Sequence, residues 1–149
     1  MHRLGSAVAA LSFIFILTSC ASIPGPGLVL DSGAVSCMPV RPGGVGVIAE
    51  QTRLEDPDSP VTLNAVELVK AKGMRLVDAF AVRNTEYLGI GSMSLDDPDD
   101  LWATRIPAVG AVIDGPDGWS IAFVLERTGE ARGTAEAVAY SFTDATGQQ

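Results

Sequence analysis

From Ala34 onward, short apolar runs alternate with clusters of Gly, Pro and Asp, and this texture constrains the fold more than any other feature. The strongest cluster is Asp114-Gly115-Pro116-Asp117-Gly118, which lies between two apolar runs and predicts a hairpin. Short strands separated by such turns are typical of all-β proteins. We therefore expect one all-β domain over residues 34–145, followed by a C-terminal tail over residues 146–149.

Strands are expected over residues 45–49, 61–69, 75–82, 87–90, 108–113, 119–125 and 134–142. In the last two runs apolar residues alternate, which is the pattern of half-buried strands. The residues concerned are Trp119, Ile121, Phe123 and Leu125 in one run, and Val138, Tyr140 and Phe142 in the other. We expect the last three runs to form an antiparallel meander, with the earlier runs forming a second sheet over its apolar face.

The predicted architecture is therefore an antiparallel two-sheet sandwich of about seven strands. Its texture resembles an immunoglobulin-like sandwich, but the Cys…Trp…Cys pattern of true immunoglobulin domains is missing. Such a likeness concerns architecture alone and carries no function.

Residues 61–70 leave two interpretations open. Apolar residues at positions 61, 65, 68 and 69 follow a helical spacing, with Ser59-Pro60 as a possible start and Gly73 as a stop. However, the segment is rich in β-branched residues, and residues 75–82 have the right length for a hairpin partner. We favour a strand here, with a helix as the alternative.

The first residues have the properties of an export signal. A short basic start at residues 1–3 precedes the apolar run Leu4–Leu17, which is too short to span a membrane comfortably. No second apolar run of spanning length follows. We therefore expect a signal peptide over residues 1–19, which takes no part in the fold.

The residues that end this run, Leu17-Thr18-Ser19-Cys20, resemble the lipobox of bacterial lipoproteins. The resemblance implies cleavage before Cys20, a diacylglyceryl thioether on its sulfur and often a further acyl chain, such as palmitate, on the new amino end. It also implies an exported protein, anchored by lipid to the cell membrane or the outer membrane. Two or three acyl chains are what stable anchoring requires. The alternative is ordinary secretion, with Ser19-Cys20-Ala21 as the cleavage site.

Residues 20–33 would then comprise the lipidated cysteine and a Gly/Pro-rich tether. Loss of Arg3 leaves 9 of the 10 Lys and Arg residues against 18 Asp and Glu, a net charge of −9. A domain this acidic has no electrostatic footprint for nucleic acid. It also has no attraction to anionic lipid, so the acyl chains would have to supply the membrane attachment.

Catalytic chemistry is hard to assemble from the remaining residues. The only histidine, His2, lies in the expected signal peptide, so no imidazole is left as a general base or metal ligand. Cys37 has no cation near it in sequence that would favour a thiolate, and we expect a small buried residue there. We expect no dissociable cofactor, and the residues favour a non-catalytic binding or accessory module. An envelope protein is a possible partner.

Two alternatives rest on the acidic run around Pro98. Asp96, Asp97, Asp99 and Asp100 are weak candidates for a calcium site, although their spacing does not match an EF-hand loop. The same acids beside Trp102 could belong to a glycan-active enzyme, which needs two carboxylates across a cleft. Trp102 is a candidate exposed aromatic at a binding edge. Its alternative role is a cap over the open end of the sandwich.

Overall fold

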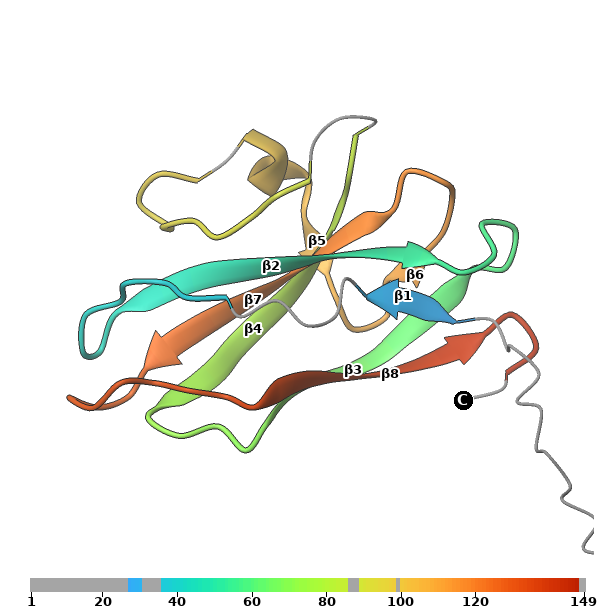
Figure 1. The fold of residues 1–149 in the computed structure, drawn as a ribbon. Coiled ribbons are helices and arrows are strands. Elements are labelled where there is room, and N and C mark those ends of the chain that lie inside the picture. Colours follow the sequence, from blue (N-terminus) through green and yellow to red (C-terminus); the bar gives the residue numbers. More distant parts are fainter. Residues whose placement is uncertain (1–26, 31–35, 86–88, 99, 148–149) are drawn as a thin grey trace, which may run out of the picture.

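The computed structural model describes residues 27–30, 36–85, 89–98 and 100–147 (Figure 1). Cys20, the residues before it and Asp99 lie outside these ranges. Among the described residues, no helix is both long enough and apolar enough to cross a membrane.

Eight antiparallel strands form two sheets that pack face to face (Figure 1). The strands are β1 (Leu28–Leu30), β2 (Val45–Leu54), β3 (Val61–Val69), β4 (Met74–Arg83), β5 (Ile106–Pro107), β6 (Val112–Ile113), β7 (Trp119–Arg127) and β8 (Ala137–Asp144). The larger sheet has the order β1-β2-β7-β4-β5, and the smaller sheet has the order β6-β3-β8. A 3-10 turn, η1 (Asp100–Thr104), precedes β5. The predicted all-β sandwich is confirmed, and residues 61–69 form a strand.

Strand pairing differs from the predicted meander. β6 pairs with β3, β7 pairs with β2 and β4, and β8 pairs with β3, so the last three strands alternate between sheets. Residues 114–118 consequently connect the two sheets and do not close a hairpin. The proposed pairing of residues 61–69 with 75–82 is wrong for the same reason, because β3 and β4 belong to different sheets.

Other expected elements are shorter or earlier than predicted. Only Val112–Ile113 of the expected strand 108–113 is extended and paired. Residues 87–88 of the expected strand 87–90 lie outside the described residues, and Gly89 and Ile90 lie in no strand. Conversely, β1 falls inside the residues expected to form a tether and pairs with the end of β2, so the sandwich begins before Ala34.

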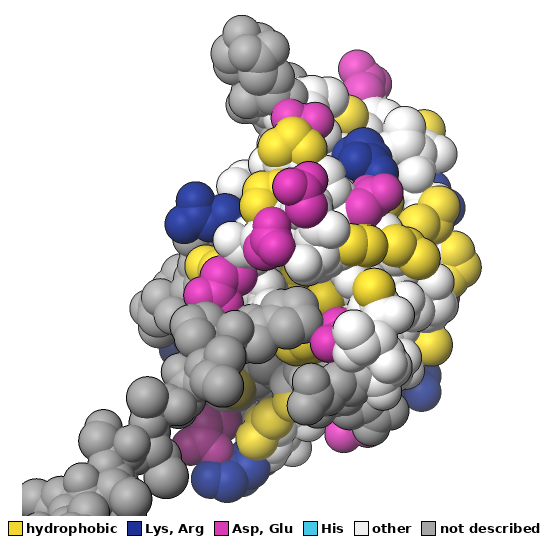
Figure 2. Space-filling view, turned by 90° about the vertical axis from the view of Figure 1, so that its right-hand side faces the viewer, with side chains coloured by type: hydrophobic (Ala, Val, Ile, Leu, Met, Phe, Trp, Pro, Cys, Tyr) yellow, Lys and Arg dark blue, Asp and Glu magenta, His cyan; other side chains and the backbone are white. Residues whose placement is uncertain are grey.

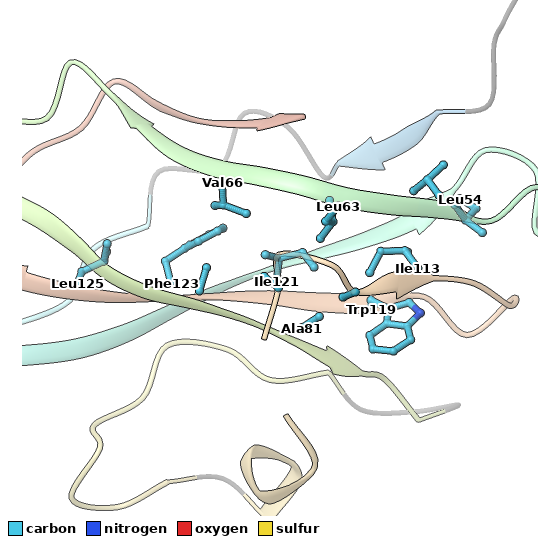
Figure 3. Packing of buried hydrophobic residues seen from close by; sticks show 13 residues of the cluster. Leu54, Leu63, Val66, Ala81, Ile113, Trp119, Ile121, Phe123 and Leu125 are labelled. Carbon is cyan, nitrogen blue, oxygen red and sulfur yellow. The ribbon is translucent and has the colours of Figure 1, made fainter. Parts of the chain in front are cut away.

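β7 is the centre of the fold because both of its faces are buried. Its inner residues, Trp119, Ile121, Phe123 and Leu125, belong to the core between the sheets. Figure 3 shows Ile121, Phe123 and Leu125 directed towards β3. There they meet Leu63 and Val66 of β3. This confirms the predicted shared face, and Trp119 is buried.

The outer face of β7 has its own core. Ala122 and Val124 pack with Val47 and Val82 of the neighbouring strands beneath Ile90 and Trp102. Both of these covering residues come from the long connection between β4 and β5, which lies across the larger sheet (Figure 1). Full burial on two faces explains why β7 is apolar or small at almost every position.

Candidate functional site

A pocket of about 480 Å³ lies between the two sheets, at the end where β2 and β8 begin and β7 finishes. This volume falls within the range of about 300–1,000 Å³ that is usual for ligand sites. The lining residues of the strands are Ile48, Glu50, Leu68, Met74, Phe123, Leu125, Glu126, Arg127, Ala137 and Val138, and those of the connecting segments are residues 36–40 and 132–136.

The inner part of the pocket is apolar. Phe123 and Leu125 of β7 form one wall and Leu68 of β3 and Val138 of β8 form the opposite one. Figure 3 shows Phe123 and Leu125 directed into the space between the sheets. Met38 also lines the pocket, and a methionine side chain adapts easily to different shapes. These contacts suit an apolar side chain or ligand body.

Most charged groups around the pocket already have partners. Glu126 pairs with Arg75 at 2.5 Å, and Glu136 pairs with Lys70 at 2.6 Å. The Arg127 guanidinium donates to backbone carbonyls, including those of Val40 at 2.9 Å and Gly129 at 3.0 Å. Arg127 therefore ties the segment before β2 to the turn after β7 and shapes the pocket.

Glu50 and Tyr140 join the two sheets beside the pocket. The Tyr140 hydroxyl donates to Glu50 Oε2 at 3.0 Å, and the Tyr140 ring packs against Phe123 with centroids 6.1 Å apart. Burial of the phenol, followed by the nearby Glu50 charge, raises the pKa of Tyr140 above its ordinary value. The hydroxyl therefore stays protonated and remains a hydrogen-bond donor.

Cys37 lies at this pocket and is exposed, so the prediction of a buried cysteine is wrong. Arg132 Nη2 donates to Cys37 Sγ at 3.5 Å. Sequence proximity could not have shown this cation, because 95 positions separate the two residues. The pocket brings together two chain segments that the sequence gives no reason to connect.

The acidic run lies away from the pocket. Asp96, Asp97 and Asp100 are exposed, and the amide of Asp97 donates to the carbonyl of Ser94 at 3.3 Å in a local turn. Across the described ranges, no group of three or more His, Cys, Asp or Glu side chains could hold a metal ion. Asp99 lies outside those ranges, so the calcium site stays a prediction. The carboxylates that share a pocket are instead Glu50, Glu126 and Glu136.

Trp102 is only 7% exposed, so the prediction of an exposed aromatic at a binding edge is wrong. Its ring meets Phe80 edge-on at 5.3 Å, and the Arg105 guanidinium lies 4.6 Å from its centroid. It does cover part of the fold, but on the outer face of the larger sheet and not at the open end of the sandwich. A buried position of this kind serves packing.

In comparisons with known proteins, no family model, no curated protein and no solved structure matches this chain.

Proposed function

We propose that this protein is an exported, lipid-anchored binding module of the cell envelope, attached through Cys20 and without catalytic activity. The observation that carries the proposal is Leu17-Thr18-Ser19-Cys20, a four-position pattern placed directly after an apolar run of signal-peptide length. The binding site would be the pocket between the sheets. An envelope protein is the class of partner that such a location makes available.

The position of the pocket supports this arrangement. β1 begins at Leu28, eight residues after Cys20, and pairs with the last residues of β2. An eight-residue stretch spans at most about 28 Å, so the β1 end of the sandwich would lie near the bilayer. The pocket lies at the opposite end of β2, beside Ile48 and Glu50. It would therefore face away from the membrane and towards a partner.

The surface near β1 supports anchoring by lipid. Figure 2 views the molecule from this side and shows acidic side chains spread over it. Glu55, Asp56 and Asp58 are exposed in the loop that follows β2. Anionic lipid repels such a surface, so charge cannot hold it against a bilayer. Attachment would have to come from acyl chains on Cys20.

Membrane attachment is tested by comparing Cys20→Ser with Cys37→Ser in cells that export the protein. The proposal expects Cys20→Ser to leave the membrane fraction or to accumulate with its signal peptide uncleaved. Cys37→Ser is the matched control and should fractionate like the unaltered chain. A Cys20→Ser protein that is processed normally and stays in the membrane would contradict the anchor.

Binding at the pocket is tested with a photo-cross-linker attached to Cys37. If Cys20 carries a thioether, Cys37 is the sole free thiol, because the chain has 2 cysteines. We expect this probe to cross-link one envelope protein in intact cells. The control moves the thiol to the exposed η1 position with Cys37→Ser and Thr104→Cys together. Equal cross-linking from both positions would refute a binding role for the pocket.

A further inference from the structure

β8 is the only long strand among the described residues that has a neighbour on one side alone. It pairs with β3 at the edge of the smaller sheet, and none of the described strands lies on its other side. The remaining edge strands are short, with three residues in β1 and two each in β5 and β6. β8 has eight residues.

The sequence of β8 carries none of the usual protection against pairing with another chain. Proteins guard exposed edges with Lys, Pro, bulges or very short strands. From Ala137 to Thr143 the strand contains no charged residue and no proline. The one irregularity in its pairing with β3 lies on β3, between Leu63 and Ala65. A long, uncharged edge of this kind is a template for an added strand.

Backbone direction shows which groups face the open side. The Leu63 amide donates to the carbonyl of Ala111 at 3.0 Å, on the β6 side of β3 and away from β8. Leu63 faces the core between the sheets. Because β8 runs antiparallel to β3 on the opposite side, the β8 residues that face the same core point their amides away from β3. Val138 is one of them and is only partly buried. It is therefore a position where the backbone donor can be removed without breaking the β3 ladder.

The inner side of this edge is apolar and incompletely covered. Val138, Tyr140 and Phe142 pack against the inter-sheet core yet remain only partly buried. Across the opening, Ile48 of β2 and Leu28 of β1 are also partly buried. The smaller sheet has three strands against five in the larger one. A fourth strand beside β8 would cover these side chains and the pocket.

We propose that β8 pairs with an extended segment of a partner protein, which adds a fourth strand to the smaller sheet. This assignment rests on the proposed binding function and names the chemistry of its partner. Every second side chain of the added strand would point inward, so the segment needs apolar residues at alternate positions. An apolar side chain near Val138 would enter the pocket.

The acidic residues near β8 indicate which side chains the partner's segment would carry at its other positions. Glu67 lies opposite Ala139 on β3 and is exposed, and Glu50 lines the pocket beneath the opening. No Lys or Arg follows Arg132 in the chain. A segment with a net positive charge is therefore favoured. A second copy of this chain is disfavoured, since pairing would bring two molecules of net charge −8 and the same acidic side chains together.

The test uses a fluorescent hexapeptide of alternating lysine and valine. The protein is the full chain carrying Cys20→Ser, so that no acyl chain is attached. Nanodiscs of zwitterionic lipid hold its uncleaved apolar run Leu4–Leu17 without adding lipid charge. We expect saturable binding. Val138→Pro, which removes the outward amide, should weaken it about tenfold. Val138→Ile keeps that amide and should bind like the unaltered residue.

Peptide controls separate strand pairing from charge. The same hexapeptide with every backbone amide nitrogen methylated keeps its lysines but cannot donate to β8 from either edge, and it should not bind. A glutamate–valine hexapeptide should not bind either. Equal binding of the methylated peptide, or none by the unmodified one, would overturn the proposal. So would a dimer of the chain that Val138→Pro dissociates, because β8 would then pair with a second copy.

The two proposals fail in different ways. Cross-linking from Cys37 that persists unchanged with Val138→Pro would leave a binding function at the pocket and refute pairing at β8. Peptide binding at β8 without any cross-linked protein in cells would instead support strand addition and refute an envelope partner at the pocket.

Discussion

Replacing Tyr140 with Phe removes one defined contact between the two sheets, the hydrogen bond from the hydroxyl to Glu50 Oε2 at 3.0 Å. The ring that packs against Phe123 stays in place. Hydrogen bonds to charged groups contribute about 1.5–3 kcal/mol. Both side chains are partly exposed, so solvent screening reduces this, and we expect a loss of roughly 1–2 kcal/mol in the free energy of unfolding.

The same contact predicts a dependence on alkaline pH. Burial and the Glu50 charge raise the pKa of Tyr140, so the folded chain keeps the phenol proton at a pH where the unfolded chain loses it. The stability from this group is therefore complete below the unfolded pKa of about 10 and declines as the pH rises further. Linkage gives a loss of about 1.4 kcal/mol by roughly pH 11.

Urea denaturation of the unaltered chain and of Tyr140→Phe, between about pH 8 and pH 11, measures both effects. The difference between the two proteins should be largest at neutral to mildly alkaline pH and should narrow above pH 10. Glu50→Gln keeps an acceptor but removes the charge, so the double variant shows how much of the effect is shared. Equal stability of the two proteins at pH 8, with parallel profiles, would refute the contact between the sheets.

Other variants test separate parts of the fold. Phe123→Ala empties the wall of the pocket and should cost about 3–5 kcal/mol in urea denaturation, whereas Phe123→Leu should cost much less. Trp102→Ala uncovers the outer core and should lower the melting temperature while leaving peptide binding at β8 intact, a result that an aromatic binding edge would not give. Gly118→Ala should destabilise more than Gly110→Ala. Both glycines have a positive φ, but a Cβ at Gly118 would lie 2.8 Å from the Thr52 carbonyl oxygen, and one at Gly110 has open space. Breaking the exposed pair of Arg83 and Asp114 with Asp114→Asn should change the free energy of unfolding by less than about 1 kcal/mol.

The sequence predicts much of the secondary structure. Alternation places Ile121 and Phe123 on one face of β7, and that face lies in the inter-sheet core. The β-branched residues of 61–69 outweigh a helical spacing because β3 packs its alternate positions Val61 and Leu63 into the same core. Local patterns of this kind depend only on neighbours along the chain.

Pairing could not be predicted in the same way. A turn such as residues 114–118 specifies that the chain reverses, but not whether the next strand joins the same sheet. The outer face of β7, with Ala122 and Val124, is also buried, and the residues that cover it come from the β4–β5 connection. The position of β7 at the centre of its sheet depends on the burial of both its faces. Alternation of apolar residues along one face does not show that the other face is buried.

The pocket was also beyond prediction. Its edges meet through long-range contacts, such as Arg127 with Val40 across 87 positions. The acidic run near Pro98, which is conspicuous in the sequence, is exposed and lies elsewhere. The acidic run, which stands out in the sequence, therefore does not belong to the pocket.

The central claim is that lipid on Cys20 holds this domain to a membrane. Mass spectrometry of the N-terminal peptide from membrane-extracted protein tests it most directly. The account predicts a peptide that begins at Cys20 and carries a diacylglyceryl group on its sulfur, with or without an acyl chain on the amino group. A peptide that begins elsewhere, or one that begins at Cys20 with an unmodified thiol, would contradict it.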